Sequence, residues 1–170
     1  MKTTFTIGED KKTLVATRTF AAPKLKLWEA YTTAELVAKW WGPYGWETEV
    51  PKLDFTVGGE WQYIMRCVDP EQTEWYGKAS AGKGVYKEID PHDSFSYTDY
   101  FTDESFTINE NMPSSHSKIE FVENADGTTT FTATTTYNTE ADLKTVIEMG
   151  MEQGYDMTLD RLEEMVTTAE

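Results

Sequence analysis

Apolar residues recur at steps of three and four along one C-terminal segment, from Thr139 to about Val166. This spacing is typical of one face of an α-helix. Thr139 and Asp142 predict an N-terminal cap, because a threonine hydroxyl can accept a hydrogen bond from a backbone N–H three residues on. We therefore predict one amphipathic helix, roughly 40 Å long at 1.5 Å per residue. Its opposite, solvated face would carry Glu148, Glu152, Asp156, Asp160 and Glu163.

Most of the chain between residues 45 and 137 has the alternation of β-strands instead. In the run Trp61–Cys67, one face carries large aromatic and sulfur side chains. That face is either the core face of an antiparallel sheet or the wall of a ligand cavity. We expect a longer strand over Trp75–Ile89, whose internal glycines indicate a bulge, a strong bend or the close approach of another backbone.

The N-terminal part predicts one strand followed by two short helices. Residues 14–20 are rich in apolar and β-branched side chains, as in a strand. Arg18 shares a face with apolar residues of this strand, so it points either into a pocket or, on an edge strand, into water. Two short helices follow between residues 23 and 41, the second capped by Thr32 with Glu35. They end in Trp40 and Trp41, which cannot both face the same side of a helix.

A long amphipathic helix needs a surface that covers its apolar face, and a strand-rich sheet can provide it. We predict an α+β helix-grip fold: a curved antiparallel sheet of about six to seven strands wrapped around the long C-terminal helix, with two short helices after the first strand. The length of 170 residues favours a single domain over residues 1–170, with its core at 13–166.

Charge narrows the range of partners. The net charge is −15, which repels phosphate backbones and anionic lipids, so we expect no nucleic-acid partner and no acidic membrane.

No segment is long and apolar enough for a membrane span, and the N-terminus lacks the apolar core of a signal peptide. Cys67 is the single cysteine and cannot form an internal disulfide. A reducing cytoplasm is the compartment these features favour.

Known catalytic motifs are missing from the sequence. The two histidines, His92 and His116, fall in expected turns or loops, and no Ser-His-Asp pattern, metal motif or dinucleotide fingerprint occurs. We expect neither a metal nor a cofactor. Catalysis would need a carboxylate or tyrosine whose pKa burial has raised, and Asp99 is the candidate by strand parity. Arg18 and Arg66 are the candidates for binding an anionic group or pairing with such an acid.

Several short motifs, in order along the chain, together resemble one superfamily. They are Pro23 with Trp28; Trp40-Trp41-Gly42-Pro43; Val57-Gly58-Gly59 with Trp61 and Tyr63; Gly84-Val85-Tyr86 with Glu88-Ile89; and Met149-Gly150-Met151 with Gly154 and Thr158-Leu159-Asp160-Arg161-Leu162. Over residues 13–166 this pattern resembles the SRPBCC superfamily, also called START-like or Bet v 1-like. Within it, the pattern is most similar to the C-terminal domain of the Hsp90 ATPase activator.

The resemblance implies a pocket for an apolar or amphipathic small molecule between the sheet and the long helix. The sheet would contribute Trp61, Tyr63, Met65 and Tyr97; the helix would contribute Ile147, Met151 and Tyr155; Trp40 and Trp41 would close one end. Gly150 and Gly154 lie on the inward face of the helix, where they allow either close helix–sheet packing or room for a ligand.

Three classes of function follow from the resemblance and the residues. The first is a protein that binds a small hydrophobic ligand, such as a lipid or polyketide-like molecule, and the second is a cyclase or hydrolase. The third is a co-chaperone with an Hsp90-like partner, although residues 1–13 are too few for the extra N-terminal domain of the eukaryotic activator. A homodimer is compatible with the edges that a curled sheet leaves open.

Overall fold

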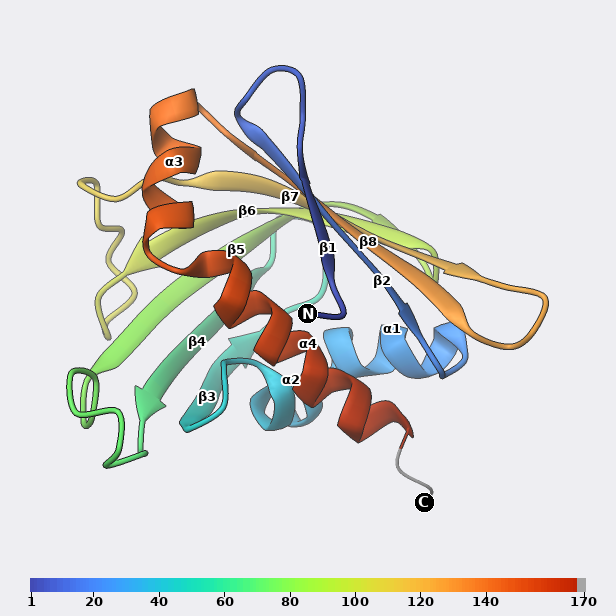
Figure 1. The fold of residues 1–170 in the computed structure, drawn as a ribbon, viewed down its shortest axis with the longest axis horizontal. Coiled ribbons are helices and arrows are strands. Elements are labelled where there is room, and N and C mark those ends of the chain that lie inside the picture. Colours follow the sequence, from blue (N-terminus) through green and yellow to red (C-terminus); the bar gives the residue numbers. More distant parts are fainter. Residues whose placement is uncertain (168–170) are drawn as a thin grey trace.

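An eight-stranded antiparallel sheet forms the frame of the molecule (Figure 1). The computed structural model describes residues 1–167. The strands lie side by side in the order β1-β2-β8-β7-β6-β5-β4-β3, so the N-terminal strands pair with the last strand of the chain. The strands are β1 (Thr4–Ile7), β2 (Thr13–Phe20), β3 (Trp46–Leu53), β4 (Glu60–Cys67), β5 (Ala79–Asp90), β6 (Ser94–Thr102), β7 (Ser115–Glu123) and β8 (Thr129–Tyr137).

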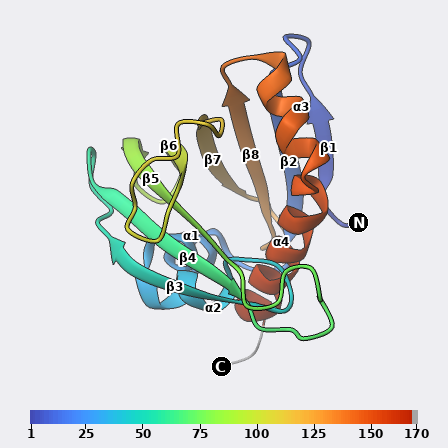
Figure 2. The same ribbon diagram turned by 90° about the vertical axis from the view of Figure 1, so that its left-hand side faces the viewer.

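The helices lie against the concave side of this sheet and at one of its ends. Figure 2 shows the sheet bent, with α3 and α4 running across it and α1 and α2 together at one end. No helix within residues 1–167 has the length and apolar character needed to cross a lipid bilayer. The helices are α1 (Lys24–Thr32), α2 (Ala34–Trp40), α3 (Glu140–Glu148) and α4 (Met151–Thr167).

The predicted α+β class and curved antiparallel sheet are confirmed, but the strand count was too low. The sheet has eight strands because β1, a four-residue strand, pairs along β2. The two short helices therefore follow β2 and not the first strand. Sequence pattern could not show β1, because most of its side chains are exposed and give no apolar periodicity.

The prediction of one unbroken C-terminal helix was wrong. The helix ends at Glu148 and restarts at Met151, and Gly150 between them has φ +87°. This left-handed conformation favours glycine, and it closes a helix end while redirecting the chain. The predicted cap at Thr139 is confirmed, since its hydroxyl accepts a hydrogen bond from the Asp142 N–H at 3.0 Å. The apolar period continues through the break, which is why periodicity alone missed it.

Two local predictions also need correction. Trp75 to Lys78 form a turn, and β5 begins at Ala79, so Trp75 and Tyr76 are exposed rather than paired in a sheet. The second short helix is preceded by Thr33 and not capped by Thr32, whose hydroxyl donates to the Trp28 carbonyl instead.

The densest packing lies at the end of the sheet that α1 and α2 cover. Tyr31 of α1 contacts Trp40 of α2 with ring centroids 4.7 Å apart, and it also packs on Phe95, Phe121 and Phe131 of the sheet. Leu159 and Leu162 of α4 are fully buried in the same cluster. Because rings of this size bury large areas, this end is a filled core. The open space lies toward the junction of α3 and α4.

Candidate functional site

Two adjoining hollows lie between the sheet and the start of α4. The first, which we call the inner cavity, has a volume of about 120 Å³, and the second, the outer hollow, has about 250 Å³. Their linings share Asp99, Ser115, Tyr137 and Met151, so the two hollows adjoin each other. The remaining lining of the inner cavity comprises Phe5, Leu14, Ala16, Tyr97, Ser117, Ile119, Ala133, Thr135 and Tyr155.

Asp99 occupies the boundary between the two hollows. Strand β6 places it on the same inward face as Phe95 and Tyr97, by the two-residue period of a strand. Its Oδ1 accepts a hydrogen bond from the Tyr63 hydroxyl at 3.3 Å. Burial raises the pKa of Asp99 to about 7, and the Tyr63 hydrogen bond opposes part of that rise. Near neutral pH this carboxyl can therefore gain or lose a proton.

Glycines on the neighbouring strand β5 make room for this arrangement. A Cβ on Gly82 would clash with the Tyr63 hydroxyl oxygen, and one on Gly84 would lie 3.0 Å from Cδ2 of Tyr97. The sequence left open whether these glycines mark a bulge, a bend or a close approach. In the structure the atoms nearest to the Cβ positions of Gly82 and Gly84 belong to the side chains of Tyr63 and Tyr97. The missing Cβ of Gly82 leaves room for the contact between Tyr63 and Asp99.

Tyrosines from several elements line the inner cavity together with Asp99. Tyr97 comes from β6, Tyr137 from the end of β8 and Tyr155 from α4, where its hydroxyl lies 3.1 Å from that of Tyr31. Burial raises the pKa of Tyr137 and of Tyr155 to about 12, so both stay neutral at pH 7. Each can donate or accept a hydrogen bond. The site thus combines one carboxyl with neutral, ring-bearing hydroxyls.

Three of the predicted pocket residues line the inner cavity: Tyr97, Met151 and Tyr155. Tyr63 does not line the inner cavity, but its hydroxyl donates a hydrogen bond to Asp99. The structure does not bring Ile147 to the same place, because its side chain lines a shallow hollow with Ile7 and Lys11 on another side of α3.

The predicted tryptophans fill space rather than enclose it. Trp40 is fully buried and donates its indole N–H to the Ala30 carbonyl. Trp41 is half-buried, with its ring centroid 4.7 Å from that of Trp61 and 5.6 Å from that of Tyr63. None of the three tryptophans lines the inner cavity or the outer hollow. Of the readings left open for this face of β4, core packing therefore describes Trp61.

A third hollow, the side groove, lies on the other side of the α3–α4 junction. It has a volume of about 400 Å³ and includes Met65, the remaining predicted pocket residue. Gly150 and Gly154 line it, and a Cβ added at either would meet no atom within 4 Å. These glycines therefore leave open space. They do not provide close helix–sheet packing, which was the other interpretation of their spacing.

Sequence reasoning missed the polar residues that β7 and β8 contribute. Ser115, Ser117, Thr135 and Tyr137 all line the inner cavity. The available signal was parity, because Thr135 and Tyr137 share a face with the buried Phe131 and Ala133. An inward face that changes from apolar to polar along one strand is typical of a lined cavity.

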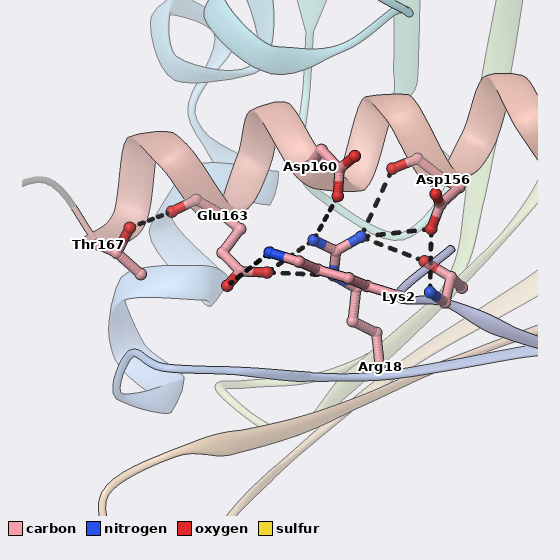
Figure 3. Close-up of polar contacts among 7 residues, drawn as sticks. Lys2, Arg18, Asp156, Asp160, Glu163 and Thr167 are labelled. Atoms are coloured by element: carbon pink, nitrogen blue, oxygen red, sulfur yellow. Dashed lines mark hydrogen bonds and ion pairs between the residues drawn. The ribbon is translucent and has the colours of Figure 1, made fainter.

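Arg18 lies outside both hollows. Its side chain is buried between β2 and α4, where Nη2 lies 2.6 Å from carboxylate oxygens of Asp160 and of Glu163 (Figure 3). Asp156 adds a third carboxylate, 3.5 Å from Nη1. The expectation that these acids face solvent was wrong, as was the edge-strand reading of Arg18, since β2 pairs on both sides. Arg18 holds the helix and is not placed to bind a ligand in the inner cavity.

Comparison with known proteins supports one family. The family model for "Activator of Hsp90 ATPase homolog 1-like protein" matches residues 21–167. Protein Ms6760 of Mycobacterium smegmatis is 30% identical, with 99% of each chain covered and a TM-score of 0.86. A Staphylococcus epidermidis protein is 32% identical over 95% of this chain and 93% of its own, with a TM-score of 0.78.

A more distant neighbour shows only the shared fold. CalU16 of Micromonospora echinospora is 16% identical, with 98% of this chain and 87% of that one covered, and a TM-score of 0.64. No curated protein matches the chain. The fold, the order of the motifs and the match over residues 21–167 agree, and the chain belongs to the family of Activator of Hsp90 ATPase homolog 1-like proteins, in the SRPBCC superfamily.

Proposed function

We propose that this protein binds a small amphipathic molecule in the inner cavity and the adjoining outer hollow. The observation that carries the proposal is that Asp99 and residues with tyrosine, serine and threonine hydroxyls line these two adjoining hollows. Ligand sites generally combine an apolar lining with a few converging polar groups that orient the ligand. Phe101, Val146 and Met149 supply apolar surface in the outer hollow.

A second candidate function uses the same site for catalysis. The pKa of Asp99, raised to about 7 by burial, suits a group that transfers protons near neutral pH. A cyclase or hydrolase of the kind that the superfamily includes would use Asp99 as its general acid or base. In that case Asp99→Asn would abolish turnover of a bound compound but leave its binding measurable.

The test is a thermal-shift screen against amphipathic aromatic compounds, with two matched variants. A ligand at about 100 times its Kd stabilises the folded state by about 2.7 kcal/mol. For a protein of this size that corresponds to about 5–10 °C. Met151→Trp, which fills the inner cavity, should abolish the shift. Met157→Trp, on the same helix but in the side groove, should preserve it.

Two results would contradict the proposal. Loss of the shift in Met157→Trp alone would place the ligand in the side groove instead. If no compound shifts the melting temperature, a function with a protein partner of the Hsp90 type would be favoured instead. A binding assay with purified Hsp90 would then test that function.

A further inference from the structure

Asp99 is a carboxylate without a cationic partner. None of the ion pairs among residues 1–167 includes it, and within that range it is the only charged residue lining the inner cavity or the outer hollow. The hydroxyl of Tyr63 is its hydrogen-bond partner, at a long 3.3 Å. Asp99 is half-buried, so its charged form loses part of its hydration without gaining a cation, and an arriving cation would offset that loss.

The surroundings of Asp99 favour a cation over other partners. Rings of Tyr97, Tyr137, Tyr155 and Phe5 line the cavity around it, and aromatic faces attract ammonium groups. The hydroxyls of Ser115 and Ser117 can accept hydrogen bonds, and an ammonium carries several donors. The net charge of −15 also favours cations and repels anions.

The two hollows suit different parts of one ligand, a polar group at Asp99 and an apolar body in the outer hollow. Asp99 and Tyr137 stand where the hollows meet, and beyond them the outer hollow presents Phe101, Val146 and Met149. A molecule with an ammonium at this boundary would therefore bury its body against apolar side chains. Burying apolar area adds roughly 25 cal/mol per Å² to binding.

We infer that the ligand is an organic amine, an ammonium joined to an aromatic or apolar body, whose ammonium binds Asp99 among the tyrosine rings. This inference rests on the proposed function, because it assumes that the same space is the binding site. It also predicts which compounds the site rejects: acids with the same body should bind least.

The experiment compares three probes that share a phenyl ring and a short chain: phenethylamine, 2-phenylethanol and 3-phenylpropionate. Each is titrated at pH 8 and followed by NMR chemical shifts of the inner-cavity residues. We expect the amine to bind at least ten-fold more tightly than the alcohol, and the acid more weakly than both. Asp99→Asn should bring the amine within two-fold of the alcohol. Asp90→Asn, which removes one exposed carboxylate elsewhere, should preserve the preference.

A pH titration of the unaltered protein provides a test without a variant. Asp99 is the group that changes charge, since the tyrosines facing it, Tyr63 from β4, Tyr97 from β6, Tyr137 from β8 and Tyr155 from α4, have raised pKa values and stay neutral. The strands beside it place Gly84 and Ser115 opposite, and neither titrates. Amine affinity should fall more than ten-fold from pH 8 to pH 5.5, while alcohol affinity should stay constant.

The outcomes separate this inference from the proposed function. If the alcohol binds as tightly as the amine at pH 8, the site takes neutral ligands and the amine inference is wrong, while binding in this space stands. The same holds if the acid binds most tightly. If none of the three probes shifts the inner-cavity resonances, the proposed function itself fails for this cavity.

Discussion

At the scale of single residues, Gly82 determines whether Asp99 has a hydrogen-bond partner. The Tyr63 hydroxyl occupies the volume that any Cβ on Gly82 would need. This hydroxyl donates a hydrogen bond to one carboxyl oxygen of Asp99. The glycine, the tyrosine and the aspartate lie on three adjacent strands, and the antiparallel register brings them together. The site therefore depends on packing between strands as much as on the residues that line the cavity.

The raised pKa of Asp99 makes folding stability depend on pH. In the folded protein the pKa is about 7, against 3.8 for the free side chain, so between these values the folded state binds more protons than the unfolded state. Stability contributed by this proton is present at low pH and is lost as pH rises through about 7. Asparagine carries no such proton, so Asp99→Asn does not suffer this loss.

We therefore predict that the stability of Asp99→Asn relative to the unaltered protein increases by about 1–2 kcal/mol from pH 5 to pH 8. One pKa unit corresponds to about 1.4 kcal/mol, and partial access of solvent to Asp99 reduces the full effect. Melting temperatures at both pH values measure it, with a relative gain of about 2–8 °C. Asp90→Asn is the control and should show no such gain. A constant difference across this range would contradict the assigned titration of Asp99.

Asp99 was found from the sequence because β6 alternates regularly between Phe95 and Phe101. Its neighbours Ser115 and Tyr137 were not found from the sequence. They come from β7 and β8 and approach Asp99 through strand pairing. Strand register across such separations depends on the whole sheet, and a single sequence does not fix it. The same limit explains why Arg18 was assigned to a pocket or to water and not to its three carboxylates.

At the scale of elements, the break between α3 and α4 shapes the hollows. Met149 lines the outer hollow and the side groove, and Met151, two residues later, lines the inner cavity. Both residues lie next to Gly150, where the two helices meet. Gly150 permits the break because its φ of +87° costs glycine little.

The two glycines of this region should respond oppositely to alanine. Gly150→Ala forces a side chain into a left-handed conformation and should destabilise the protein by about 1–2 kcal/mol. Gly154 lies inside α4 with open space at its Cβ position, so Gly154→Ala should stabilise by up to about 1 kcal/mol. Urea unfolding of both variants measures the two effects. Equal destabilisation would show that Gly154 is needed for packing and that our description of its surroundings is wrong.

Element types were easier to predict than element ends. Alternation revealed β4 and β6, and capping by Thr139 located the start of α3, because these signals are local. Gly150 gave no such signal, since a glycine inside a helical period is equally compatible with a continuous helix. The turn at Trp75 to Lys78 was misread because tryptophan and tyrosine favour strands by propensity. Both misreadings concern the walls of the side groove.

At the scale of the whole molecule, both edges of the sheet oppose pairing with another chain. Edge strand β1 has four residues, and edge strand β3 contains Pro51 and a shift of register between Glu49 and Lys52. Short edges, prolines and irregular register all discourage edge-to-edge association. The homodimer expected from open edges thus stays a prediction, for which sedimentation would be the measurement.

Arg18 joins the N-terminal part of the chain to its C-terminal helix. Besides the three carboxylates of α4, it donates to the Thr3 hydroxyl at 3.3 Å, and the Thr3 N–H donates to Asp156 at 2.9 Å. A buried cation surrounded by carboxylates contributes little net stability over an apolar pair, but removing it alone leaves repelling, desolvated charges. This cluster therefore holds α4, with Tyr155 and Met151, over the inner cavity.

We predict that Arg18→Met destabilises the protein by about 3–5 kcal/mol, because the carboxylates of Asp156, Asp160 and Glu163 lose their cationic partner. The control is Arg66→Met, which breaks one exposed ion pair, with Glu104 at 2.8 Å, and should cost less than about 1 kcal/mol. Urea unfolding at pH 7 gives both values.

Adding Asp160→Asn and Glu163→Gln to Arg18→Met should restore part of the loss, since two of the unpaired charges are then removed. If the loss were the same without those charges, packing of the arginine stem, and not charge pairing, would hold the two ends of the chain together.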